Sequence, residues 1–523
     1  MRTLGLLPWP RVSRNPVVGV IVFGIVILAA YKAAEAVLAD DLTNLAYAAI
    51  LFIGGAVVVA ILNDWRRGLY ILVGWIIFED FVRKYLGNNM AVYFAKDVLT
   101  LILYLSFFRA RRNRQVEMFR IPFRVPLLLF VWFGVIQMFN PASTSIFYGV
   151  LGIKVNFLYL PLVYVGYALI ESEEDLHSFF SFVCVLILIV AGLGLTQSII
   201  GPTFLNPSHL QEEIRELSTT YRIAPISGLM AYRPTSVFVS AGRFQDFLIV
   251  SWIVSLGYAG YLLLRTRRGR TLAFTTIGTL AAASLMSTSR GVFMWNTGSA
   301  ILICAGFLWG APWRQREALR VLRAIQRAAV FVGVAIILLT VIFPDEFGSR
   351  LAIYSETLMP NSPTSELVHR TQTYPLKQLE YAFDHPRWPY GYGIGTCTLG
   401  TQYVARILGA APMNISVESG FGNMIIELGI VGLILWLLLG FSITVSAWKV
   451  VNELRGSPWF PLALTITLYA AILFFPMAFV SSTAYQDFVL NSNLWLLLGI
   501  LYRLRSFPAA VEIAMQKAAL GQG

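Results

Sequence analysis

The sequence predicts an all-helical protein that crosses a membrane many times. Hydrophobic residues make up 57% of the 523 positions and charged residues only 13%, about half the charged fraction of ordinary soluble proteins. Apolar runs recur from Val17 to Tyr502, and one membrane-spanning helix needs roughly 20 apolar residues. These observations exclude a soluble enzyme with a single anchor and indicate an all-α polytopic bundle of about fourteen transmembrane helices.

Apolar runs and basic loops together predict the layout of the spans. We expect spans near 17–38, 45–62, 69–82, 92–108, 123–139, 154–170, 179–200, 236–264, 271–288, 291–309, 328–343, 420–445, 459–480 and 486–502. With both termini in the cytoplasm, every strongly basic loop falls on the cytoplasmic side, as the positive-inside rule requires. The first run is longer than the apolar region of a usual signal peptide, so we interpret it as an uncleaved span. The positive-inside rule thereby explains the net charge of +12. We therefore expect the protein to interact with the lipid bilayer and not with nucleic acid.

The predicted chain has four regions. They are the N-terminal spans 1–150, the central spans 151–343 with an outer loop at 201–235, the large outer loop 344–419, and the C-terminal spans 420–523 with a short cytoplasmic tail. The large loop has about 76 residues, and loops of that length are usually functional or disordered. Helix-like apolar spacing over 364–384, with Pro375 expected to kink or split the helix, predicts an ordered and partly helical loop.

Charged residues inside spans are candidates for function because they are costly to insert. Arg243 and Asp246 lie three residues apart in the eighth predicted span, where they form either a structural ion pair or a functional pair. Lys96 and Glu79 lie near span ends, where snorkelling is the simpler interpretation. Glu427 in the twelfth predicted span is either an end-of-helix group that meets a neighbouring donor or a functional acid.

Three arginines are predicted on the outer side, where topology does not explain them. Arg233 lies where loop 201–235 enters the eighth span, Arg290 lies in a tight hairpin between spans, and Arg370 lies in the large loop. Guanidinium groups offer paired donors that suit phosphate oxygens. If the three converge, they form a pyrophosphate clamp, and otherwise each pairs with an acid in its own loop.

Acid–base candidates on the outer side are few. His385, with Asp384 beside it, and Glu418 stand out, and His369 and His209 are further loop histidines. Glu418 immediately precedes an apolar helix, so it is either a general base or a carboxylate that complements the helix N-terminus. Nucleotide-binding, zinc-binding and serine-hydrolase motifs are all missing from the sequence. We therefore expect no cofactor, no metal and a substrate that is already activated.

Four motifs in order resemble the O-antigen ligase and polysaccharide polymerase superfamily of bacterial membrane glycosyltransferases. They are Arg233-Pro-Thr-Ser-Val-Phe, Ser287-Thr-Ser-Arg290-Gly, His385-Pro386 leading to Gly391-Tyr-Gly-Ile-Gly395, and Glu418-Ser-Gly ahead of Glu427-Leu-Gly-Ile-Val-Gly. The large outer loop before a late span is also typical of that family. The resemblance covers roughly residues 150–500.

The resemblance implies metal-independent, inverting transfer of a glycan from an undecaprenyl-pyrophosphate donor on the outer face of the cytoplasmic membrane. Arginines matching Arg233 and Arg290 would hold the pyrophosphate, with Arg370 as a further candidate. The ligases place a histidine base shortly before the E-L-G-x-x-G helix, and this sequence has Glu418 there instead. That departure favours a polymerase of exopolysaccharide repeat units, in which Glu418, raised in pKa by partial burial, or His385 is the base.

Two further functions stay open beside the polymerase. One is ligase-type transfer of the glycan to another acceptor, and the other is transport of a lipid-linked glycan or a small anion. A transporter predicts broken helices and charges near the middle of the bilayer. The polymerase hypothesis implies a flippase and a chain-length regulator as protein partners.

Overall fold

The computed structural model describes residues 42–507, apart from position 88, gaps within 208–211, 266–267, 360–368, 410–416 and 481–483, and most of 311–340. The chain forms two compact units. One contains the residues up to Glu79 together with Asn89–Met118, and the other contains Asp80–Asn88 and everything from Phe119 onward.

The smaller unit is built from α2 (Leu42–Asn63), α4 (Met90–Arg112) and the first part of α3 (Trp65–Tyr85). Trp65 packs edge-on against Phe107, with ring centroids 5.2 Å apart. Lys96 Nζ lies 2.9 Å from a carboxylate oxygen of Glu79, and both side chains are buried. The expectation that these charges snorkel is therefore wrong, because they neutralise each other inside the unit.

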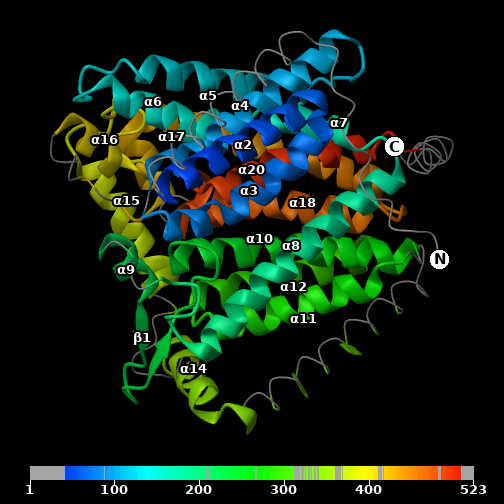
Figure 1. Ribbon diagram of the computed structural model, residues 1–523, viewed down its shortest axis with the longest axis vertical. Coiled ribbons are helices and arrows are strands. Elements are labelled where there is room, and N and C mark those ends of the chain that lie inside the picture. The colour runs from blue at the N-terminus through cyan, green and yellow to red at the C-terminus, as the bar shows by residue number, and fades with distance from the viewer. Residues whose placement is uncertain are drawn as a thin grey trace. The chain divides into compact units, whose positions relative to one another are not determined.

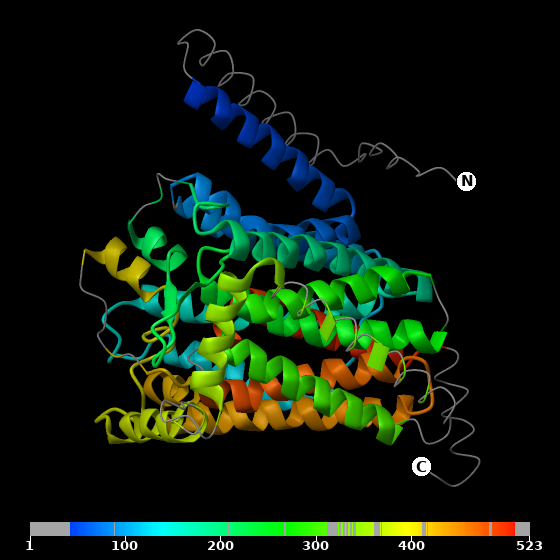
Figure 2. The same cartoon turned by 90° about the horizontal axis from the view of Figure 1, so that it is seen from below.

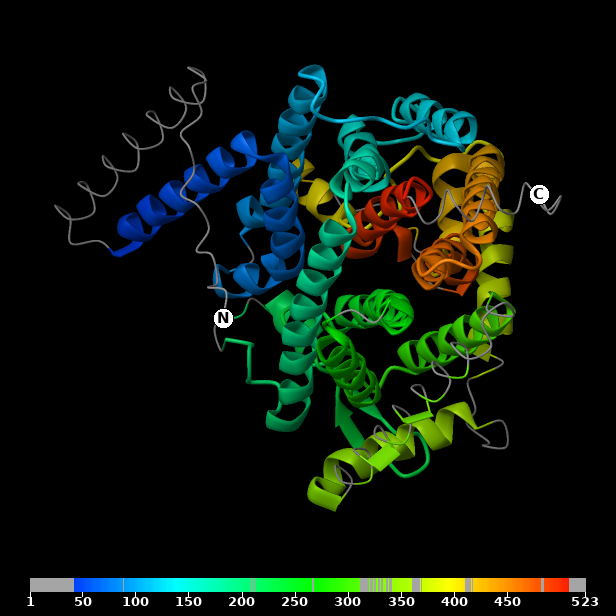
Figure 3. The ribbon, with the colours of Figure 1, turned by 90° about the vertical axis from the view of Figure 1, so that its right-hand side faces the viewer.

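The larger unit contains most of the long helices. They are α5 (Arg124–Gln137), α6 (Ile146–Phe157), α7 (Leu162–Leu169), α8 (Glu173–Ile200), α10 (Ala241–Arg265), α11 (Arg270–Met286), α12 (Arg290–Gly310), α17 (Gly420–Leu454), α18 (Phe460–Ile472) and α20 (Phe488–Leu504). Helix α8 begins with a capping box, in which Ser172 and Asp175 exchange side chain-to-backbone hydrogen bonds. Helix α10 packs against α11, α12 and α18, and α20 packs along α7. Figures 1 and 3 show α8, α10, α11 and α12 side by side.

A multi-pass membrane protein is supported by these helices. Among the described residues, seven helices are long and apolar enough to cross a membrane, and three more apolar helices are shorter. Two of the seven are composite: α6 and α7 join as Ile146–Leu169, and α18 continues through the π-helix η2 (Leu473–Met477) into α19 (Ala478–Val480). The predicted span 17–38 lies outside the described residues and 328–343 largely so. The count of about fourteen stays a prediction.

Smaller elements gather at the end of the larger unit where α10 begins. They are α9 (Glu212–Ser218), β1 (Tyr221–Ile223), β2 (Met230–Tyr232), α14 (Pro344–Leu358), the π-helix η1 (His369–Thr373), α15 (Tyr374–Asp384), α16 (Thr401–Leu408) and the 3-10 turn η3 (Ala484–Gln486). Figures 1 and 2 show the hairpin, α14, α15 and α16 at this end, which we call the loop end. For the described residues of 344–419 the prediction of a partly helical loop is confirmed, and its outer location stays a prediction. Pro375 lies in the first turn of α15, where the preceding π-helix stops.

Candidate functional site

The β-hairpin places Arg233 at the loop end of α10. Strands β1 and β2 pair antiparallel with Tyr221 opposite Tyr232, and Arg233 N donates a hydrogen bond to Thr220 O at 3.2 Å. This bond continues the ladder by one residue, so the backbone of Arg233 is fixed by the hairpin. Its side chain is half-buried.

The turn between α11 and α12 places Arg290. We call residues 287–290 the arginine turn. Thr288 has a φ of 53°, a left-handed conformation that costs energy for a residue with a branched Cβ. Ser287 Oγ donates to Ser284 O at 2.7 Å, and Arg222 Nη1 donates to Thr288 O at 3.0 Å. These bonds hold the turn that carries Arg290 into the first position of α12.

Arg233 and Arg290 lie close enough to repel each other. Burial and the neighbouring charge of Arg290 both lower the pKa of the Arg233 guanidinium. Within the described part of the chain, Arg233 Nε is buried and has no hydrogen-bond partner. A buried donor without a partner is costly, and so are two adjacent cations. An anion with several acceptor oxygens would relieve both costs.

Arg350 of α14 joins the two segments that carry these arginines. Its guanidinium donates to Met286 O at 3.0 Å, to Ser198 O at 3.1 Å and to Tyr232 O at 3.5 Å. Met286 ends α11 just before the arginine turn, and Tyr232 immediately precedes Arg233. The side chain of Arg350 is only 2% exposed and also pairs with Glu346. Arg350 therefore fixes the spacing between the two backbones.

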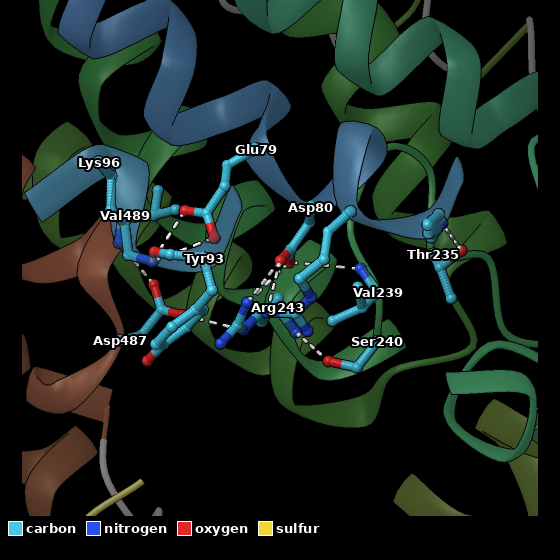
Figure 4. A network of polar contacts seen from close by, with 12 residues as sticks. Glu79, Asp80, Tyr93, Lys96, Thr235, Val239, Ser240, Arg243, Asp487 and Val489 are labelled. Atoms are coloured by element: carbon cyan, nitrogen blue, oxygen red, sulfur yellow. Dashed lines mark hydrogen bonds and ion pairs between the residues drawn. The ribbon is translucent and has the colours of Figure 1, made fainter. Parts of the chain in front are cut away.

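A second network of charges lies deeper at the same end (Figure 4). Arg243 Nη1 lies 2.8 Å from both carboxylate oxygens of Asp80, and its Nε lies 4.0 Å from Asp487. Lys84 Nζ donates to Thr235 Oγ1 and to Ser236 O, each at 3.0 Å. The Arg243 side chain is thus committed to structure.

Arg243 has a further partner that its local spacing does not show. It forms a short ion pair with Asp80, 163 positions away in the sequence, and its charge also acts on Asp246 in the same helix. The spacing of three residues puts Arg243 and Asp246 within reach on one helix. In the contact with Asp80 a single guanidinium nitrogen, Nη1, donates to both carboxylate oxygens at 2.8 Å.

Glu418 lies at the start of α17 with an exposed side chain. Tyr374 Oη donates to Glu418 Oε2 at 2.8 Å, and Glu418 N donates to Gln378 Oε1 at 2.9 Å. Both partners belong to α15, which packs against the first turns of α17. The expected partial burial of Glu418 is wrong, because α15 contacts one side of the carboxylate and leaves the rest to solvent.

His385 ends α15 and is half-buried. Its Nδ1 lies 3.3 Å from Tyr392 Oη, and its ring lies between the rings of Tyr381 and Tyr392. Asp384 beside it is exposed. These two rings and the Tyr392 hydroxyl orient the imidazole of His385.

Glu427 holds residues 391–395, which we call the glycine loop, against α17. The helix is interrupted at Gly429, which has φ 67° and ψ −171°. Tyr392 N and Gly393 N donate to the carbonyls of Ile426 and Glu427 at 2.8 and 2.9 Å. The buried carboxylate of Glu427 also accepts from Gly395 N at 3.1 Å and from Cys397 N at 2.8 Å. The expectation that Glu427 meets neighbouring donors is therefore confirmed, although it lies inside α17 and not at a helix end.

The remaining predicted residues are only partly described. Arg370 belongs to η1, but its side chain lies outside the described residues, as does His209. His369 is exposed, with its ring 5.7 Å from that of Tyr374. Convergence of Arg370 with the other two arginines therefore stays a prediction.

Sequence reasoning brought Arg233 and Arg290 forward but missed the groups around them. Arg350 and Arg222 hold the arginine turn, and Gln245 of α10 accepts a hydrogen bond from Ser289 Oγ at 2.9 Å. The available signal for Gln245 was its place in a polar cluster with Arg243 and Asp246 at the start of a long apolar span. Arg350, in a loop segment, gave none.

Comparison with known proteins adds no assignment to this geometry. No protein-family model matches the chain, and no curated protein is similar enough to count as a relative.

Proposed function

We propose that this protein is a metal-independent, inverting membrane glycosyltransferase that polymerises lipid-linked oligosaccharide repeat units. The donor is an undecaprenyl-pyrophosphate-linked oligosaccharide. The observation that carries the proposal is the pair of neighbouring cations, Arg233 and Arg290, with a buried guanidinium N–H that lacks a partner among the described residues. Such a pair at the loop end of an apolar bundle suits a pyrophosphate on a lipid carrier.

The proposed topology places this end outside the cytoplasm. In α10, Arg265 lies at the opposite end from the arginine pair, where it binds Glu173 at 2.8 Å. Arg455 donates to Trp309 O, at the C-terminal end of α12, at 2.8 Å. Basic side chains at the ends away from the arginine pair support a cytoplasmic location for those ends. About fourteen spans with both termini inside complete the proposal.

In the proposed reaction an acceptor hydroxyl attacks the anomeric carbon of the donor. The new glycosidic C–O bond forms as the C–O bond to pyrophosphate breaks, and undecaprenyl pyrophosphate leaves with the electron pair. Arg233 and Arg290 stabilise the charge that develops on the leaving phosphate. The hydroxyl proton goes to Glu418, or to His385 if Glu418 serves only the helix N-terminus.

A transporter of lipid-linked glycan or a small anion is the second candidate. The interruption of α17 at Gly429 and the partly buried Arg243–Asp80 pair favour it, because transporters use broken helices and intramembrane charges. The loop contacts of Glu427 give the interruption a structural role, which favours the transferase.

The test is polymer production in a deletion strain complemented with variants. We expect Arg233→Ala and Arg290→Ala to stop chain growth and leave single repeats on the lipid carrier. Arg290→Lys should also fail because an ammonium does not reproduce the guanidinium fork. Arg406→Ala, on the exposed surface of α16, is the control. Wild-type polymer from both alanine variants at normal protein level would refute the clamp, and loss of export with normal chain length would favour the transporter.

A further inference from the structure

A second buried donor lacks a partner beside the arginine turn. Gln245 lies in the second turn of α10, and its Oε1 accepts the hydrogen bond from Ser289 Oγ at 2.9 Å. Its Nε2 is buried and has no hydrogen-bond partner among the described residues. Ser289 directly precedes Arg290, so this free N–H belongs to the surroundings of the arginine pair.

The orientation of the Gln245 amide follows from its partner. Ser289 Oγ donates its proton to Gln245 Oε1 and also accepts a hydrogen bond from Val292 N at 3.3 Å. That assignment leaves the amide NH₂ as the unsatisfied group. The side chain also points away from the deeper charge network, because Arg243, two residues earlier, is turned by roughly 200° on the helix and binds Asp80.

Two different side chains leave buried donors unused: Gln245, which is bonded to the arginine turn, and Arg233, on which the charge of Arg290 in that turn acts. Arg233 Nε and Gln245 Nε2 are both N–H groups, and Arg290 adds positive charge. Buried donors of this kind are normally satisfied. A ligand that satisfies them all must carry negative charge and several acceptor oxygens, which a phosphate group provides and an apolar or cationic ligand does not.

We propose that Gln245 is a further substrate-binding residue, which donates its amide N–H to a phosphate oxygen of the anion held by Arg233 and Arg290. This inference rests on the proposed function and deepens it by adding a neutral donor to the two cations. The neutral amide adds directionality without adding repulsion to the arginine pair. The class of ligand is a phosphate ester or diphosphate, from a polyprenyl carrier or from a phospholipid headgroup.

The test uses the purified full-length protein in detergent and inorganic pyrophosphate as the probe, with affinity measured by calorimetry. Gln245→Met keeps the length of the side chain but removes the donor, and should weaken binding by about ten- to hundredfold. Gln245→Glu keeps the acceptor for Ser289 and replaces the donor by a negative charge, so it should weaken binding further. Asn296→Leu is the matched control, because Asn296 Nδ2 already donates to Ser284 Oγ at 2.9 Å.

The outcomes separate this inference from the proposed function. If wild type binds pyrophosphate and a folded Gln245→Met protein binds it with the same affinity, Gln245 has no role in binding. The proposed role of the arginine pair would be unaffected. Wild type that binds no pyrophosphate in detergent, or in nanodiscs of phosphatidylcholine, would overturn both. Repeating the titration in phosphatidylglycerol nanodiscs identifies the source. If phosphatidylglycerol lowers the pyrophosphate affinity of wild type but not that of Gln245→Met, the amide binds a phospholipid headgroup. If the affinity of wild type is the same in both kinds of nanodisc, the amide binds the pyrophosphate of the carrier.

Discussion

Replacing Arg350 by methionine removes the group that joins the two arginine-bearing segments. Methionine has a similar length and fits an apolar surrounding, so the change isolates the polar contacts. It leaves the carbonyls of Met286 and Ser198 without the donors that now lie 3.0 and 3.1 Å away. The weaker contact with Tyr232 O at 3.5 Å is also lost.

The expected loss of stability follows from these contacts. Each buried carbonyl left unpaired costs roughly 1–3 kcal/mol, so the two short bonds together give about 2–6 kcal/mol. Glu346 adds little, because its side chain is 42% exposed and water solvates the freed carboxylate. The loss is expected locally, at the junction of α11, α14 and the β-hairpin.

Two measurements on Arg350→Met check this reasoning. The thermal unfolding midpoint in detergent should fall, and pyrophosphate affinity should fall with it because the spacing of Arg233 and Arg290 is no longer fixed. Glu346→Gln is the control, which should stay within about 1 kcal/mol of wild type. If Arg350→Met unfolds at the same temperature as wild type, the buried guanidinium does not stabilise the junction of the two segments.

Four further predictions concern the loop end. Glu427→Gln keeps one acceptor but loses the charge that binds two N–H groups, so limited proteolysis should cut the glycine loop faster than in wild type; equal rates would remove Glu427 as its anchor. Gly391→Ala should destabilise the protein by more than about 1 kcal/mol, because φ is 73° and an added Cβ would collide with Glu427 O; an unchanged melting temperature contradicts this. Glu418→Gln should fold normally yet leave single repeats on the carrier, whereas long chains would shift the base to His385. Burial and the charge of Glu427 raise the pKa of the Cys397 thiol and so lower its reactivity. Topology is better tested with Tyr390→Cys, because the Tyr390 side chain is 75% exposed. This cysteine should react with a membrane-impermeant maleimide on intact cells, and labelling only after lysis would show that the orientation is the reverse.

The helices were predictable because apolar runs are a local signal. The run at 179–200 became α8, and the run at 271–288 became α11. Helix-like spacing and Pro375 also predicted the order and the irregularity of the loop segment that contains α15. Each of these features depends on residues close together in the sequence.

Tertiary pairing was not predictable by the same means. Local spacing pointed to Asp246 but gave no sign of the short ion pair between Arg243 and Asp80, 163 positions away. The exposure of Glu418 depends on how α15 lies against α17, which no local pattern encodes. Arg233 and Arg290 were found because arginines in loops that are predicted to lie outside conflict with the topological bias of membrane proteins. The roles of Gln245 and Arg350 could not be identified from the sequence, because the hydroxyl and most of the carbonyls that they contact belong to residues far away in the chain.

In the proposed function the arginine pair, Arg233 and Arg290, holds the pyrophosphate of a lipid-linked glycan during transfer. The most direct measurement is reconstitution of the purified protein in proteoliposomes with an undecaprenyl-pyrophosphate-linked repeat unit, followed by gel separation of the products. We expect a ladder of chain lengths from wild type and from Arg406→Ala, together with release of undecaprenyl pyrophosphate. Arg233→Ala and Arg290→Ala should yield only the starting repeat. A wild-type protein that moves the lipid-linked repeat across the bilayer without lengthening it, or a ladder from both alanine variants, would contradict the claim.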